Sequence, residues 1–102
     1  MIKAIKIDVQ NRTVTEIKIK ESLKAYYKEI GCELIEFVKI DAINDLMVDE
    51  EGLYTDNPYF IMQGLYQPMK GNALVVGVDF EEGKTISTTL TVEEVKAKVH
   101  FV

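Results

Sequence analysis

The chain has 102 residues, a length that suits one domain rather than two. Hydrophobic residues make up 47% of the chain and charged residues 28%, and these ordinary proportions exclude disorder as its main state. The single cysteine cannot form an internal disulfide, and the single histidine cannot build a histidine metal site alone. With 12 basic and 17 acidic residues, the net charge is −5.

The chain carries no signal that directs it to or across a membrane. No stretch approaches the roughly 20 apolar residues that a membrane-spanning helix needs. The first six residues interleave isoleucine with lysine and contain no apolar region of a signal peptide. We therefore expect a cytoplasmic protein without contact to a membrane, in which Cys32 is a reduced thiol.

The charges are distributed unevenly along the chain. Residues 1–40 contain eight basic and six acidic side chains, whereas residues 41–102 contain four basic and eleven acidic ones. This balance repels nucleic acid, so direct binding of DNA or RNA is not expected. Two interpretations of the acidic half stay open: it keeps a small protein in solution, or it meets a basic partner.

The first 20 residues predict an antiparallel hairpin. Over residues 2–9, Ile5 and Ile7 alternate with charged side chains, which is the period of a half-buried strand. Gln10–Arg12 is a turn signal, and residues 13–20 alternate in the same way as a second strand.

Residues 22–30 predict a helix, with Ser22 as its N-cap and Gly31 as the left-handed residue that ends it. Its inward stripe is expected to consist of Leu23, Tyr26, Tyr27 and Ile30. Residues 33–40 follow as a strand that is apolar on both faces, which predicts a central position in a sheet.

The middle of the chain predicts a short strand over residues 46–48, an acidic turn over 49–52, and a short helix over about 59–65. Asn57 would cap this helix, and Pro58 suits its first position. The residues that follow, 68–72, are expected to form a loop.

Residues 73–80 form the most apolar strand and should be the most buried one, with a short partner strand over 85–88. Thr91 and Glu94 form a capping box that begins a final helix over about 92–99. Together the elements predict an α+β domain with a mainly antiparallel sheet of four to six strands and two or three helices packed on it.

The residues offer little support for catalysis. His100 has no acid or thiol partner nearby in the sequence, and Cys32 follows the end of a helix, whose dipole disfavours the thiolate. Asp79, Glu94 and Lys96 resemble a nuclease set only in part, because the last two lie on a predicted helix. The acidic turn lacks the spacing of a calcium loop, and no phosphate loop or serine elbow is present. We therefore expect no enzyme, no metal and no cofactor.

The best candidate for a binding face is the acidic, tyrosine-rich middle of the chain. Residues 54–66 contain four of the nine aromatic side chains, and tyrosines are common interface anchors. The alternative is a second small core, which we favour for Phe60 and Ile61 and weigh equally for Tyr54 and Tyr66. The predicted partner-binding residues are Asp45, Asp49, Glu50, Glu51, Tyr54, Asp56, Asn57, Tyr59 and Tyr66.

Several segments occur in the same order as in a known family. They are Met1–Ala4 with Ile7 and Asp8, the strand from Val14 to Ile17, Ile30–Gly31, Leu34–Glu36, Val48–Gly52 followed by Asn57, Ala73–Val78, and Leu90–Thr91 with Glu94. The chain resembles a family of uncharacterised small domains found mainly in bacteriophages, prophages, plasmids and conjugative elements. The resemblance covers most of the chain.

This resemblance implies a small accessory protein of a mobile element. Some relatives inhibit host defence systems, including CRISPR nucleases, so the resemblance implies a non-enzymatic inhibitor that binds a host protein. Negative surfaces can occupy the basic groove of a nuclease, which agrees with the acidic second half of the chain. The number of subunits stays open.

The alternative function is a module that binds a small ligand, such as a nucleotide signal. Phosphate groups need converging cations or backbone N–H groups. Only the N-terminal half supplies such cations, from Lys18, Lys20, Lys24 and Lys28.

Overall fold

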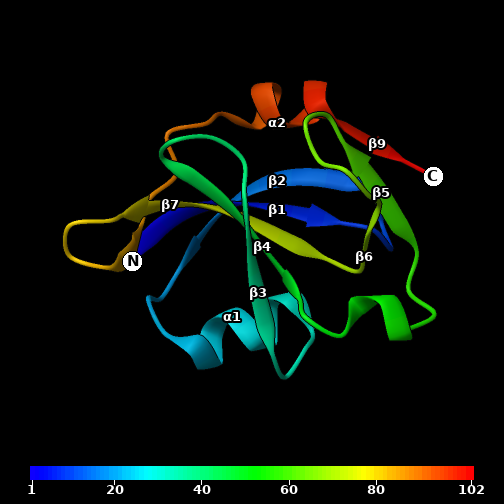
Figure 1. Cartoon of the computed structure of the whole chain (residues 1–102), viewed down its shortest axis with the longest axis horizontal. Helices are drawn as coiled ribbons and strands as arrows, with labels where there is room; N and C mark the ends of the chain where they lie inside the picture. Colours follow the sequence, from blue (N-terminus) through cyan, green and yellow to red (C-terminus); the bar gives the residue numbers. More distant parts are fainter.

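A computed structural model describes residues 1–102, and it shows an α+β fold built on a six-stranded antiparallel sheet (Figure 1). The strands of this large sheet are β1 (Ile2–Asp8), β2 (Thr13–Ile19), β3 (Ile35–Lys39), β4 (Asn44–Asp49), β7 (Ala73–Asp79) and β8 (Lys84–Ile86). A small three-stranded sheet consists of β5 (Tyr59–Met62), β6 (Met69–Lys70) and β9 (Val99–Phe101). The helices are α1 (Leu23–Ile30), α2 (Val92–Lys98) and the 3-10 turn η1 (Gly52–Tyr54). The predicted α+β architecture is confirmed.

Strand β7 lies at the centre of the large sheet, whose strand order is β2-β1-β7-β4-β3, with β8 also paired to β7. Its residues 73–77 are all buried, which confirms the prediction from their apolar run. A strand with neighbours on both sides and apolar residues on both faces requires a cover on each face of the sheet.

The two faces of the large sheet have different covers, so the domain has three layers (Figure 1). Alternation along β1 directs Ile5 and Ile7 to one face and Ala4 to the other. The first face packs against Val95 of α2 and against Phe60 of the small sheet. The second face packs against α1.

Helix α1 begins and ends where the sequence predicts. The hydroxyl of Ser22 accepts a hydrogen bond from the backbone N–H of Ala25 at 3.2 Å, and Gly31 has a φ of 86°. Tyr26 and Ile30 are buried against the sheet. The prediction that Leu23 faces inward is wrong: it is 55% exposed, and the residues of α1 that pack against the sheet are Ala25, Tyr26 and Ile30. Neither α-helix is long and apolar enough to cross a membrane.

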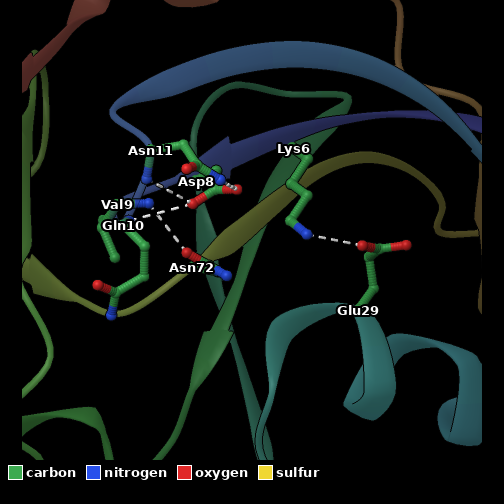
Figure 2. A network of polar contacts seen from close by, with 7 residues as sticks. All are labelled: Lys6, Asp8, Val9, Gln10, Asn11, Glu29 and Asn72. Atoms are coloured by element: carbon green, nitrogen blue, oxygen red, sulfur yellow. Dashed lines mark hydrogen bonds and ion pairs between the residues drawn. The ribbon is translucent and has the colours of Figure 1, made fainter.

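An ion pair attaches α1 to the sheet (Figure 2). The ammonium of Lys6 on β1 lies 2.7 Å from a carboxylate oxygen of Glu29 on α1, and the two side chains are 20% and 35% exposed. A charged pair at the margin of an apolar contact contributes little net stability, but it fixes the rotation of the helix on the strand.

The turn between β1 and β2 is held by side-chain hydrogen bonds that Figure 2 shows together. The carboxylate of Asp8 accepts bonds from the backbone N–H groups of Gln10 and Asn11. The bond from Asn11 is the main cause of a pKa of Asp8 below its usual value. Asn72, just before β7, accepts a bond from the backbone N–H of Val9 at 2.9 Å and so connects this turn to the central strand.

Asn44 is the one fully buried side chain of β4 that is polar, and all of its polar atoms have partners. Its amide oxygen accepts bonds from the hydroxyl of Thr88 at 2.6 Å and from the backbone N–H of Thr89 at 3.2 Å. Its amide nitrogen donates to the Thr89 hydroxyl at 2.8 Å and to Asp41. This network ties the β3–β4 hairpin to the segment that leads into α2.

Four expectations about strands and helices are corrected. The loop expected over residues 68–72 contains strand β6 (Met69–Lys70), which pairs with β5. The predicted helix over 59–65 is strand β5, because Phe60 and Met62 are buried in alternation with Tyr59 and Ile61 and pair with β9. The last residues form β9 rather than the end of a helix or a tail. Strand β3 is an edge strand that pairs only with β4 instead of a central strand, and neither of its faces is fully buried.

Replacing Asn44, the residue at the centre of this polar network, tests how much the network contributes to the free energy of unfolding. We expect Asn44→Ala to lower the free energy of unfolding by about 2–4 kcal/mol, because the Thr88 hydroxyl and the Thr89 N–H lose their acceptor inside the protein. Urea denaturation measures this loss. The matched control is Asn11→Ala, an exposed asparagine that bonds to Asp8, for which we expect about 1 kcal/mol or less. Equal losses for the two variants would contradict a special role of Asn44.

Candidate functional site

A groove of about 310 Å³ lies between the β3–β4 hairpin, η1 and the loop that precedes and includes β6. It opens on the same face of the large sheet that the small sheet covers, because Val38 and Val48 at its floor belong to the apolar layer on that face. We name it the acidic groove, for the charges described below.

The wall formed by η1 stands close to β6. A Cβ atom at Gly52 would lie 2.9 Å from the backbone carbonyl oxygen of Lys70, so only glycine permits this approach. The Lys70 ammonium donates a hydrogen bond to the carbonyl of Thr55 at 3.2 Å, and the Thr55 hydroxyl donates to the carbonyl of Gly52 at 2.8 Å. These contacts hold the wall and the strand together.

The acidic turn at the end of β4 is ordered by its own hydrogen bonds. The carboxylate of Asp49 accepts a bond from the backbone N–H of Glu51 at 2.9 Å. The backbone N–H of Glu50 donates to the carbonyl of Leu34 at 3.0 Å. These bonds fix the backbone of the turn and the carboxylate of Asp49.

The charges that line the groove are unbalanced toward negative. Glu36, Asp49 and Glu50 line it together with Lys39 and Lys70. The ammonium of Lys70 is bonded to the backbone of the η1 wall. The ammonium of Lys39 lies 5.7 Å from the centre of the Phe80 ring, which is no part of the groove. Neither lysine forms an ion pair with these carboxylates, and the charged residues of the lining have a net charge of −1.

Apolar side chains accompany these carboxylates. Leu65 and Met69 line the groove and are partly buried against the core. Leu53 and Tyr66 also line it, but the first is 64% exposed and the second is fully exposed. Exposed leucine and tyrosine side chains at the margin of a concave surface are suitable anchors for a partner.

The nine residues predicted as a binding face are only partly brought together. Asp49, Glu50 and Tyr66 line the acidic groove. Glu51 and Tyr54 are exposed at the two ends of η1, beside the groove, and Asp56 is exposed just after it.

The other three predicted residues lie elsewhere. Asp45 is near the opposite end of β4, about 13 Å from Asp49 along the strand, and pairs with Lys39 across the ladder. Asn57 accepts a long bond from the side chain of Gln10 at 3.4 Å. Tyr59 lies on the face of the small sheet that points away from the core, since Phe60 beside it is buried.

Sequence reasoning missed Glu36 and Leu53 among the residues that line the groove. Glu36 lies in a strand that was predicted to be central. A carboxylate in a covered strand would not be accessible to a partner, so Glu36 was not predicted as a binding residue. Leu53 follows an acidic turn in which no helical signal is present. The one usable signal was the short distance in sequence between the acidic turn and the aromatic segment.

The residues with catalytic potential are scattered. His100 is exposed in β9 opposite Ile61. Cys32 is half-buried, and burial together with the nearby charge of Asp49 raises the pKa of its thiol. No group of three or more histidine, cysteine, aspartate or glutamate side chains comes close enough to hold a metal ion.

These features define a small α+β domain with an acidic groove at one edge of its large sheet. The chain belongs to the family described as a domain of unknown function (DUF3846), which matches residues 2–100. The expected membership of an uncharacterised family of small domains is thereby confirmed. No curated protein and no solved structure matches the chain significantly.

The pKa of Asp45 allows a test of its role in stability. Burial raises this pKa above the usual value; Lys39 lowers it, and Asp41 adds to the rise. A raised pKa in the folded state means that ionised Asp45 destabilises the fold, an effect that is present at neutral pH and vanishes below the pKa of the unfolded chain, about 3.9. We therefore expect Asp45→Asn to stabilise the protein at neutral pH, and this advantage to disappear near about pH 3.

Urea denaturation at the two pH values measures the effect. Asp56→Asn, at an exposed aspartate, is the matched control for the change in net charge. A loss of stability in Asp45→Asn at neutral pH would show that Asp45 stabilises the fold through Lys39 instead.

Proposed function

We propose that this domain is a non-enzymatic binding protein that takes a basic segment of a partner protein in the acidic groove. The observation that carries the proposal is that three acidic residues, Glu36, Asp49 and Glu50, line the groove without forming an ion pair with its two lysines. Such a surface attracts lysine and arginine side chains and increases the rate of encounter with a basic partner.

The apolar part of the groove complements this attraction. Lysine and arginine side chains bury their hydrocarbon stems while their charged ends remain near carboxylates. Val38 and Val48 at the floor suit the stems, and Tyr66 and Leu53 supply exposed anchors at the margin. The groove therefore matches a segment in which basic and apolar side chains are mixed.

The resemblance to domains of bacteriophages and mobile elements supports a more specific role. On this proposal the protein acts in the cytoplasm of a bacterial host and inhibits a defence protein. A nuclease that binds nucleic acid through a basic groove, such as a CRISPR nuclease, presents the charge that the acidic groove complements. Binding there competes with the nucleic acid and requires no chemical step.

The alternative of a nucleotide-binding module gains no support from the arrangement of its lysines. Lys18 lies on β2 and Lys20 just after it, and Lys24 and Lys28 lie on α1, all of them exposed. None of the four lines the acidic groove or the groove between β2 and β9. Phosphate groups need cations that converge on one point.

The acidic groove is tested by removing its charges without changing its shape. The triple variant Glu36→Gln, Asp49→Asn, Glu50→Gln keeps an acceptor oxygen at position 49 for the turn. We expect it to bind a purified CRISPR nuclease of the host at least about tenfold more weakly than the unchanged protein, as measured by biolayer interferometry and by inhibition of DNA cleavage.

The matched control removes three charges outside the groove, with Glu81→Gln, Glu82→Gln and Glu93→Gln, and should retain its affinity at moderate salt. Equal weakening in both triple variants would show that net charge alone drives binding. Unchanged binding in the groove variant would place the partner surface elsewhere. If nucleotides raised the melting temperature of the protein and no partner protein bound it, the alternative of a nucleotide-binding module would be favoured.

A further inference from the structure

A second groove, of about 450 Å³, lies between β2 and β9. It is independent of the acidic groove and shares no residue with it. Thr13, Val14 and Thr15 of β2 form one side, Val99 and Phe101 of β9 form the other, and Arg12 and Lys96 complete it. We name it the β2–β9 groove.

Both sides of the β2–β9 groove are unpaired edges of sheets. Strand β2 pairs only with β1, and β9 pairs only with β5. An edge strand leaves alternate backbone N–H and C=O groups free to pair with another strand. Further along β2, Glu16 and Lys18 place exposed charges on the strand, as protected edges do, whereas Thr13–Thr15 carries no charge.

Arg12 is the only arginine of the chain, and the structure fixes its side chain at this groove. Its guanidinium donates a hydrogen bond to the carbonyl of Phe101 at 3.2 Å and lies 5.9 Å from the centre of the Phe101 ring. A guanidinium has five N–H donors in a planar fork. The donors not used by Phe101 can receive a carboxylate in two parallel bonds.

The charge of the groove is opposite to that of the whole protein. The chain has a net charge of −5, yet two cations and no carboxylate line the β2–β9 groove. A nucleic acid would bring phosphates to the two cations, but it has no peptide main chain to pair with the free strand edges. An acidic peptide satisfies both the cations and the free strand edges.

We propose that the β2–β9 groove binds an extended acidic peptide, which adds as a strand along Thr13–Thr15 of β2 and places a carboxylate between Arg12 and Lys96. The contact covers about three residues, or about 7 Å of strand. Main-chain hydrogen bonds supply affinity, and the two cations select peptides with acidic side chains.

The test uses a hexapeptide of alternating valine and glutamate, with acetyl and amide ends, titrated into the isotope-labelled protein. We expect backbone amide shifts at Thr13–Thr15 and Val99–Phe101, slower hydrogen exchange on β2, and weaker binding at high salt. The same hexapeptide with lysine in place of glutamate should give no shifts. Absence of shifts with the glutamate peptide at millimolar concentration would overturn the proposal.

Arg12→Gly removes the guanidinium at a position where glycine is favoured, because the φ of Arg12 is 56°. We expect this variant to keep its thermal stability and to bind the glutamate peptide about tenfold more weakly. Lys96→Gln should weaken binding in the same direction, and Lys24→Gln, at an exposed lysine of α1, should not.

Unchanged affinity in Arg12→Gly would overturn the proposed site. Shifts at the same residues with a single-stranded oligonucleotide, and none with the peptide, would also overturn it and assign the groove to nucleic acid.

Discussion

The whole structure depends on the burial of β7 on both of its faces. A strand with apolar residues 73–77 pointing in both directions cannot lie at the surface of an open sheet. One cover, α1, lies in the connection between β2 and β3, which are the two edges of the sheet, and the other cover is built from α2 and the small sheet. The short elements late in the chain have little stability of their own, and they are stabilised by packing against the large sheet.

The same constraint determines which parts of the large sheet remain accessible. The covers protect the centre of the large sheet and leave its two edges, β2 and β3, accessible. Each edge borders a groove because the layer of α2 and the small sheet does not cover that edge completely. Opposite charges then distinguish the grooves: carboxylates gather beside β3, and the sole arginine lies beside β2.

Much of the fold could be predicted because its signals are local. The alternation around Ile5 and Ile7 and the capping box of Thr91 and Glu94 both reappear in the structure, the latter with both reciprocal hydrogen bonds. Strand β5 could not be predicted, since Asn57 and Pro58 imitate a helix start and the pairing with β9 joins residues about 40 positions apart. The edge position of β3 likewise depends on partners that no local pattern encodes, and so Glu36 escaped the predicted site.

The strand order has a consequence for how the two grooves relate. Four strand spacings separate β2 from β3, which is about 19 Å at the usual distance between neighbours. This span exceeds the Debye length of about 8 Å at physiological salt, so a charge neutralised at one edge is hardly felt at the other. A rigid sheet of this width would act as a spacer with two independent ends, able to hold a cationic and an anionic chain side by side without letting them pair with each other.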